Sequence, residues 1–327
     1  MDECLKNAEG PMTKPTLARS NLAPQFVLRH SCFFRPSFFV IRCSLALALL
    51  TSGDHWANAF ADQETTQPKI GPARGTLVVH GGGKLAKEFL SMFVELAGGP
   101  NAPLVVIPTA GEADEYSEDW PGLKPWIKAG FKHIALLHTR DRAEADTPEF
   151  VRPLETARAV WITGGRQWRL ADVYLATRTE QALRGVLDRG GVIGGSSAGA
   201  TIQGSYLVRG SPRDNTIMMS PGHEQGFGYL RHVAIDQHLL TRHRARDMLS
   251  VIAKHPELLG IGIDEQTAIV VHGDIFTVIG TSRVAIYDPG YRPPLDGEPY
   301  YFLQRDDQFD LARRRKIGKA DAPQNPR

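Results

Sequence analysis

Short apolar segments rich in Val and Ile alternate with longer amphipathic segments between residues 76 and 202. Within residues 84–97, for example, apolar side chains recur every three or four positions, which is the spacing of one helix face. Strands that alternate with helices are typical of a parallel sheet with helices on both faces. The sequence therefore predicts an α/β fold, with strands at residues 76–80, 104–108, 134–137, 160–163 and 191–195.

The pattern changes near residue 261, where the apolar segments become short and closely spaced. Residues 261–264, 268–272, 275–279 and 283–287 are predicted to be strands. Because the connections between them are too short for crossover helices, we expect an antiparallel extension of the same domain.

Composition divides the chain into four parts. Residues 1–61 are predicted to be a leader, and the polar, Pro-containing residues 62–74 a linker. The folded domain is predicted at residues 75–305. A polar, basic tail that stays in solvent is expected at residues 306–327, because Arg313 begins a run of four basic residues there.

The predicted leader has the order of segments found in a secretory signal peptide. Between Met12 and Thr51 five residues are basic and none is acidic, and an apolar run occupies residues 44–50. Small-residue cleavage sites follow, so we expect export to the periplasm or the exterior after cleavage near Ala59 or Ala61. The apolar run is too short to span a membrane, for which about 20 residues are needed. The alternatives left open are a disordered extension and a start at Met1 or at Met12.

Charge and cysteine content exclude several kinds of site. Six of the 38 basic and four of the 36 acidic residues precede residue 62, so the remaining chain carries 32 of each. A formally neutral body gives no support for nucleic acid as a partner. The three cysteines, Cys4, Cys32 and Cys43, all lie in the leader. The body therefore has no thiol nucleophile, disulfide or thiolate metal site.

Residues 195–199, Gly-Ser-Ser-Ala-Gly, follow an apolar strand and precede a helical segment. That is the setting of a G-x-S-x-G nucleophile elbow, in which the flanking glycines allow a sharp turn and the serine is exposed. We therefore predict that Ser197 is a nucleophile. The backbone N–H of Ala198 is one predicted oxyanion donor, and the N–H of Gly165, at the end of a neighbouring strand, is the candidate for the second.

A serine nucleophile needs a base and an acid that orients it. Of the eleven histidines, His238 is favoured because Asp236-Gln237-His238 interrupts an apolar stretch. Other candidates remain open from the sequence alone, namely His80, His223, His243 and His272. For the acid, Asp264 and Glu265 are adjacent at a predicted strand end, so their side chains point to opposite faces and only one can reach the histidine.

These motifs together resemble the cyanophycinase branch of a serine peptidase family that also contains dipeptidase E. The resemblance covers about residues 75–290, with matching motifs in order at residues 81–83, 163–167, 196–200, 236–244 and 262–265. It implies a fold like that of class I glutamine amidotransferases, with Ser197 as nucleophile, His238 as general base and Glu265 as acid. It also implies a substrate pocket, formed by Gln167, Asp236, Gln237, Arg242 and Arg244.

The resemblance implies hydrolysis of cyanophycin, a poly-aspartate with arginine on each side-chain carboxylate, to β-aspartyl-arginine dipeptides without metal or organic cofactor. Two departures are His243 and Asp247, which stands where the best-known cyanophycinases carry arginine. Three alternatives stay open. They are an exopeptidase like dipeptidase E that acts on another acidic peptide, an α/β-hydrolase esterase with Asp264 and His272, and a non-catalytic binding protein. The expected partner is a peptide substrate, and the oligomeric state is open, a homodimer included.

Overall fold

The computed structural model describes residues 69–320, so the predicted leader lies outside the described residues. The predicted linker is described from Lys69 onward, and there it is held to the folded body. The carboxylate of Asp274 accepts hydrogen bonds from the backbone N–H groups of Lys69, Ile70 and Gly71, at 2.8, 2.8 and 2.9 Å. The linker prediction is therefore wrong for these residues, because one carboxylate binds three of their backbone N–H groups.

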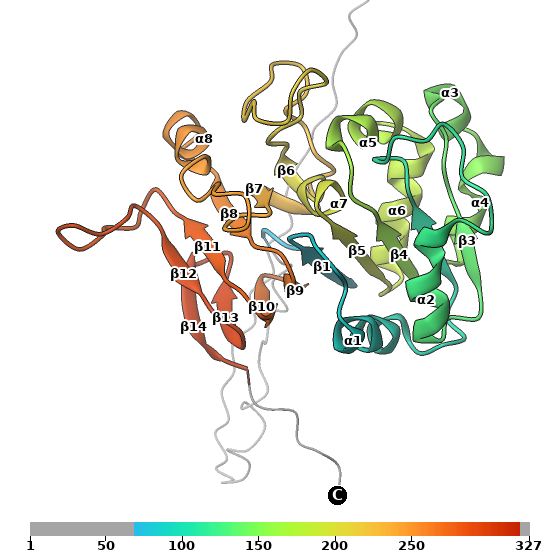
Figure 1. The fold of residues 1–327 in the computed structure, drawn as a ribbon, viewed down its shortest axis with the longest axis horizontal. Helices are drawn as coiled ribbons and strands as arrows, with labels where there is room; N and C mark the ends of the chain where they lie inside the picture. The colour runs from blue at the N-terminus through green and yellow to red at the C-terminus, as the bar shows by residue number, and fades with distance from the viewer. Residues whose placement is uncertain (1–68, 321–327) are drawn as a thin grey trace, which may run out of the picture. The chain divides into compact units, whose positions relative to one another are not determined.

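A nine-stranded mixed sheet forms the centre of the described fold (Figure 1). Five of its strands are mutually parallel, as predicted, and β9 pairs antiparallel with the first of them. The α/β fold class is therefore confirmed. From one edge to the other the strands are β14 (Arg315–Lys319), β13 (Asp307–Asp310), β10 (Ile275–Gly280), β9 (Thr267–His272), β1 (Thr76–His80), β5 (Val192–Ser196), β4 (Ala159–Ile162), β2 (Leu104–Ile107) and β3 (Ile134–Leu136).

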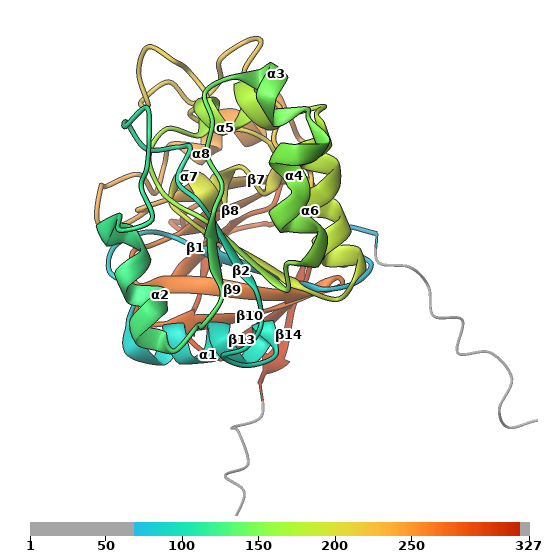
Figure 2. The ribbon, with the colours of Figure 1, turned by 90° about the vertical axis from the view of Figure 1, so that its right-hand side faces the viewer.

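Helices cover both faces of the parallel strands, and Figure 2 shows α1 and α2 on one side with α4 and α6 on the other. Successive strand residues point to opposite faces. Val78 of β1 therefore packs with Phe93 and Trp126, whereas Leu77 and Val79 face the cluster that contains α4 and α6. The helices are α1 (Lys87–Ala97), the 3-10 helix η1 (Pro121–Leu123), α2 (Lys124–Ala129), α3 (Arg142–Ala145), α4 (Pro148–Thr156), α5 (Gln167–Tyr174), α6 (Arg178–Asp188), α7 (Ala198–Thr201) and α8 (Met248–Lys254).

A second sheet of five strands was not predicted. The predicted strand near residue 261 belongs to it as β8, which pairs parallel with β7 rather than extending the first sheet. Only β9 and β10 extend the first sheet as expected. The chain passes from one sheet to the other at Gln266, whose φ of 55° allows the sharp turn. The strands of the second sheet, in order, are β12 (Tyr301–Leu303), β11 (Val284–Tyr287), β8 (Leu259–Ile263), β7 (Leu230–Gln237) and β6 (Gly204–Tyr206).

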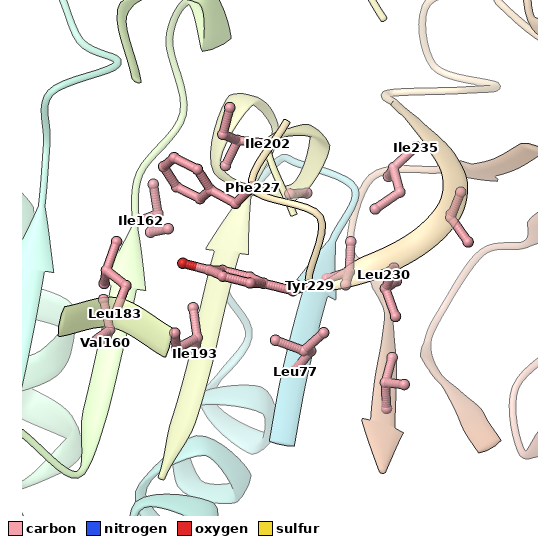
Figure 3. Close-up of a cluster of buried hydrophobic side chains, with 14 of the residues drawn as sticks. Leu77, Val160, Ile162, Leu183, Ile193, Ile202, Phe227, Tyr229, Leu230 and Ile235 are labelled. Carbon is pink, nitrogen blue, oxygen red and sulfur yellow. The ribbon is translucent and has the colours of Figure 1, made fainter. Parts of the chain in front are cut away.

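One large apolar cluster joins the two sheets (Figure 3). Tyr229 lies in its middle, with Ile162 and Ile193 from the first sheet near its ring and Ile235 from β7 beyond it. Because both sheets bury one face in this cluster, the strand ends that carry the predicted site are held by a shared core.

The region predicted to be a solvated tail contains two strands, and that prediction is wrong as far as residue 320. Strand β13 pairs with β10, and β14 pairs with β13 at the edge of the first sheet. Phe309 is fully buried and its ring stacks on Phe276 at a centroid distance of 5.1 Å. Burial of Phe309 and backbone pairing with β10, rather than the surrounding charges, decide the structure here. No helix within residues 69–320 is long and apolar enough to cross a membrane.

Candidate active site

Ser197 lies at the carboxyl end of β5, directly before α7, with φ 56° and ψ −113°. This conformation is costly for a residue with a Cβ, at about 1–3 kcal/mol. It persists because the turn is tightly packed on both sides. A Cβ at Gly195 would lie 2.1 Å from the carbonyl oxygen of Gly199, and a Cβ at Gly199 would lie 2.1 Å from that of Ile162. The two glycines of the motif are therefore required by close backbone approach, as the sequence predicts.

His238 follows β7 and also has a positive φ, of 54°. Its Nδ1 lies 2.5 Å from Oε1 of Glu265, and its Nε2 lies 2.9 Å from Oγ of Ser197. An ionised carboxylate can only accept, so Nδ1 carries the proton and Nε2 is free to accept from the serine hydroxyl. The three predicted residues therefore form one hydrogen-bonded chain, drawn from β5, β7 and the turn after β8.

The neighbouring acids have different surroundings. Asp264 turns away from His238 and accepts hydrogen bonds from the backbone N–H groups of Leu240 and Thr241, each at 2.9 Å, and from the Ser282 hydroxyl at 2.7 Å. Glu265 alone reaches His238. The choice between the two acids, which spacing left open, is made by which side of the turn faces the histidine.

Gly82 and Gly83 have a contact role that the sequence did not reveal. A Cβ at Gly82 would lie 2.2 Å from the Cε1 atom of His238, and a Cβ at Gly83 would lie 2.8 Å from Oε2 of Glu265. The Gly81 carbonyl also accepts the backbone N–H of His238, at 2.9 Å. The glycine loop after β1 is thus the surface against which the imidazole and the carboxylate lie.

The other candidate histidines do not reach Ser197. His80 is buried, and its Nδ1 accepts the backbone N–H of Gly82 at 3.1 Å. Burial, together with the nearby His238, lowers the pKa of His80 to about 4. His223 lies 3.4 Å from Asp172.

His243 is exposed in the turn that follows His238.

The esterase alternative fails on the position of His272. Nδ1 of His272 lies 3.1 Å from Oγ1 of Thr76, which is at the start of β1. Ser197 lies at the opposite end of that strand, where its backbone N–H donates to the carbonyl of His80. The pair Asp264 and His272 therefore lies apart from the serine, on different elements.

The pKa of His238 is lowered below its ordinary value. Burial is the largest cause. The hydrogen bond to Glu265 opposes the shift, and the positive charges of Arg242 and Arg244 add to it. The imidazole is therefore neutral near pH 7, which is the form that can accept the Ser197 proton.

Two backbone donors lie beside the serine. The N–H groups of Gly165 and Ala198 donate to no other group within residues 69–320. Ala198 is the first residue of α7, so its N–H has no partner in the helix. The loop at Gly164 is close to the nucleophile, since a Cβ there would lie 3.2 Å from the Cβ of Ser197. Both predicted oxyanion donors are thus unpartnered in the described chain.

The predicted pocket residues differ in whether their side chains already form hydrogen bonds within the protein. Arg242 is exposed. Gln167 is buried and donates to the Val208 carbonyl at 2.8 Å, and Arg244 donates to Oε1 of Gln237 at 3.2 Å. These internal contacts hold the side chains of Gln167 and Gln237 in fixed positions.

The position of Asp236 does not agree with the prediction that this residue contacts substrate. Its carboxylate has no exposed surface, and Nε and Nη2 of Arg209 donate to its two oxygens at 2.8 and 2.9 Å. Arg209 also donates to Oδ2 of Asp247 at 2.6 Å. Sequence reasoning missed Arg209, although a charged residue between Leu207-Val208 and Gly210 is the kind of signal that selected His238.

Comparison with known proteins shows the family of this chain. The model of peptidase family S51 matches residues 77–279. The cyanophycinase of Geminocystis herdmanii is 33% identical over 225 residues, which cover 66% of this chain and 81% of that protein. The cyanophycinase of Nostoc sp. is 31% identical over 219 residues, covering 64% and 70%. The crystal structure of a peptidase from an acI-B1 Actinobacterium matches with a TM-score of 0.57 and 25% identity, covering 72% and 97%. The chain therefore belongs to peptidase family S51 and is a serine-type peptidase.

Proposed function

We propose that this peptidase hydrolyses cyanophycin to β-aspartyl-arginine dipeptides through a triad of Ser197, His238 and Glu265. The observation that carries the proposal is the hydrogen-bonded chain from the Ser197 hydroxyl through His238 to Glu265. It is supported by the strained turn that presents the serine, and by two free backbone donors next to it. The same arrangement serves acyl transfer on unrelated folds.

In the proposed reaction, Oγ of Ser197 attacks the carbon of the scissile carbonyl while its proton passes to Nε2 of His238. The oxyanion accepts hydrogen bonds from the N–H groups of Gly165 and Ala198, each worth about 3–4 kcal/mol of barrier. His238 then gives the proton to the leaving amine as the C–N bond breaks, which leaves an ester on Ser197. A water that loses a proton to His238 then attacks this ester, and as the C–O bond to Oγ breaks, His238 returns the proton to Ser197 and the acid product leaves.

The proposed substrate rests on charge and on the relatives. Each unit of cyanophycin carries one free carboxylate and one guanidinium, so recognition needs cationic and anionic or amide partners. Arg242 and Arg244 lie four and six residues after His238, and Arg guanidinium groups bind carboxylates with defined geometry. Two relatives at 31–33% identity are cyanophycinases.

The proposal is tested by incubating the purified full chain with insoluble cyanophycin, with Ser197→Ala in parallel. Mass spectrometry is expected to find β-aspartyl-arginine with the wild-type chain alone. If both proteins are folded by circular dichroism and neither releases dipeptide, cyanophycin is the wrong substrate. Cleavage of other aspartyl dipeptides by the wild type would then favour an exopeptidase like dipeptidase E.

We also propose that the chain is exported and cleaved near Ala59 or Ala61. The support is the basic segment, the apolar run at residues 44–50 and the small-residue sites that follow. Expression of the full chain in a Gram-negative host, followed by cell fractionation and N-terminal sequencing, tests it. The expected result is a periplasmic protein that begins at Phe60 or Asp62, and an uncleaved cytoplasmic protein would refute the proposal.

A further inference from the structure

A cavity of about 970 Å³ opens between the start of α1 and the segment η1–α2. Four lysines line it, Lys84, Lys87, Lys124 and Lys128, and all four are exposed. Apolar side chains such as Leu90 lie between them. No Asp or Glu is among the lining residues.

The four lysines have no side-chain partners among the residues that the structure describes. None of the four forms an ion pair or a side-chain hydrogen bond with any residue in the range 69–320, although many of the arginines there do. Four like charges around one cavity repel each other and favour a bound anion. Cationic walls around an apolar floor suit a peptide that carries free carboxylates close to aliphatic carbon atoms.

The cavity begins where the serine–histidine–glutamate chain ends. Lys84 follows Gly83, which lies against Oε2 of Glu265. Gln266, the residue after Glu265, lines the cavity, and its backbone N–H donates to the Gly82 carbonyl at 2.9 Å. An extended peptide advances about 3.3 Å per residue. A substrate bound at Ser197 would therefore need to extend by several residues past Glu265 to occupy the cavity.

We propose that this cavity is a second substrate subsite, which binds the free carboxylates of an acidic peptide several residues from the scissile bond. This inference rests on the proposed function, because it extends the same substrate beyond the triad. Its consequence is a preference for long acidic chains over single units. The attraction is between exposed charges, so salt weakens it over a Debye length of about 10 Å at 0.1 M.

The binding test uses the full chain with Ser197→Ala and a fluorescein-labelled ten-residue poly-L-aspartate, whose carboxylates stand for those of the substrate. Fluorescence anisotropy at low salt is expected to show binding that Lys87→Glu with Lys124→Glu weakens at least tenfold. The matched control reverses two exposed lysines outside the cavity, Lys132 and Lys254, and is expected to change affinity less than twofold. Circular dichroism establishes that each variant is folded.

Equal weakening by both double variants would overturn the proposal, because it would show a general charge effect. Absence of binding by the parent would also overturn it. If a labelled single-stranded DNA of similar charge binds as tightly and is equally sensitive to Lys87 and Lys124, the site is a general polyanion site and the peptide assignment is wrong.

Kinetics separate this inference from the proposed function. The KM of the wild-type chain for soluble cyanophycin is expected to rise at least tenfold in the Lys87→Glu, Lys124→Glu variant at low salt, and the difference is expected to shrink at 0.5 M salt. Activity with no such difference refutes the subsite alone. No activity of the wild type on cyanophycin refutes the proposed function, and the anisotropy result then decides the subsite independently.

Discussion

Gly82 lies directly against the ring of His238, and a Cβ at position 82 would sit 2.2 Å from the Cε1 atom of that ring. The first prediction is that Gly82→Ala lowers kcat/KM at least 100-fold, because the imidazole must move away from Ser197 and small displacements of catalytic groups are costly. Activity assays on folded protein test this.

Gly99→Ala is the matched control for that variant. Gly82 and Gly99 both have positive φ, 121° and 101°, so alanine is strained at either position, but nothing lies within 4 Å of a Cβ at Gly99. The control is expected to lose stability and keep its activity. An equal loss of kcat/KM in both variants would mean that backbone strain, and not contact with His238, is responsible.

Glu265 and Asp264 are expected to respond differently to the same substitution. Glu265→Gln removes the carboxylate that orients His238, so kcat is expected to fall by at least 100-fold while thermal stability changes little. Asp264→Asn keeps an oxygen that can accept from the N–H groups of Leu240 and Thr241 but removes the charge and the acceptor of the Ser282 hydroxyl, and it is expected to cost about 1–3 kcal/mol of unfolding free energy. Melting curves and kcat measured on both variants check this, and a reversed pattern would assign the acid to Asp264.

The acid limb of the pH profile reports His238. The neutral imidazole is the active form and its pKa is lowered, so kcat/KM is expected to fall with acid only at a pH below about 6.5, the ordinary histidine value. Arg242→Gln removes a positive charge that lowers this pKa, so the midpoint is expected to move to higher pH. Arg246→Gln is the control, because the guanidinium of Arg246 is paired with Glu298. A downward shift for Arg242→Gln would contradict the assignment of the limb to His238.

Arg209 is expected to matter for stability. Arg209→Met leaves the fully buried Asp236 carboxylate without its partner, at a cost of about 3–5 kcal/mol. Arg246→Met breaks an exposed pair and is expected to cost at most about 1 kcal/mol. Urea denaturation measures both. Similar small losses in the two variants would show that Asp236 is protonated or hydrated when Arg209 is absent.

The edge strands are also expected to contribute to stability. Phe309→Ala removes a fully buried ring that stacks on Phe276, and a loss of about 3–5 kcal/mol is expected. Ile317→Ala, on the exposed strand β14, is expected to change stability by less than about 0.5 kcal/mol. If Phe309→Ala melts like the wild type, residues 306–320 behave as the solvated tail that their charges suggested.

The sequence alone determined the parallel strands and the elbow at Ser197, and it favoured His238 and an acid at residues 264–265 without excluding the other histidines. These are local: apolar periodicity fixes which segments are strands, and glycines at 195 and 199 mark a turn that other residues cannot make. Order along the chain left the esterase alternative open, and only the position of His272 beside Thr76 excluded it.

Tertiary structure alone decided which acid faces His238, since both acids lie in one turn and only its orientation in space separates them. It also decided that β8 joins a second sheet, that Asp236 is held by Arg209, and that residues 307–310 and 315–319 are strands. Each depends on a partner far away in sequence. Burial and pairing between such distant residues decide whether a short or charged segment is stable as a strand. Local composition does not reveal these contacts, so it does not predict them.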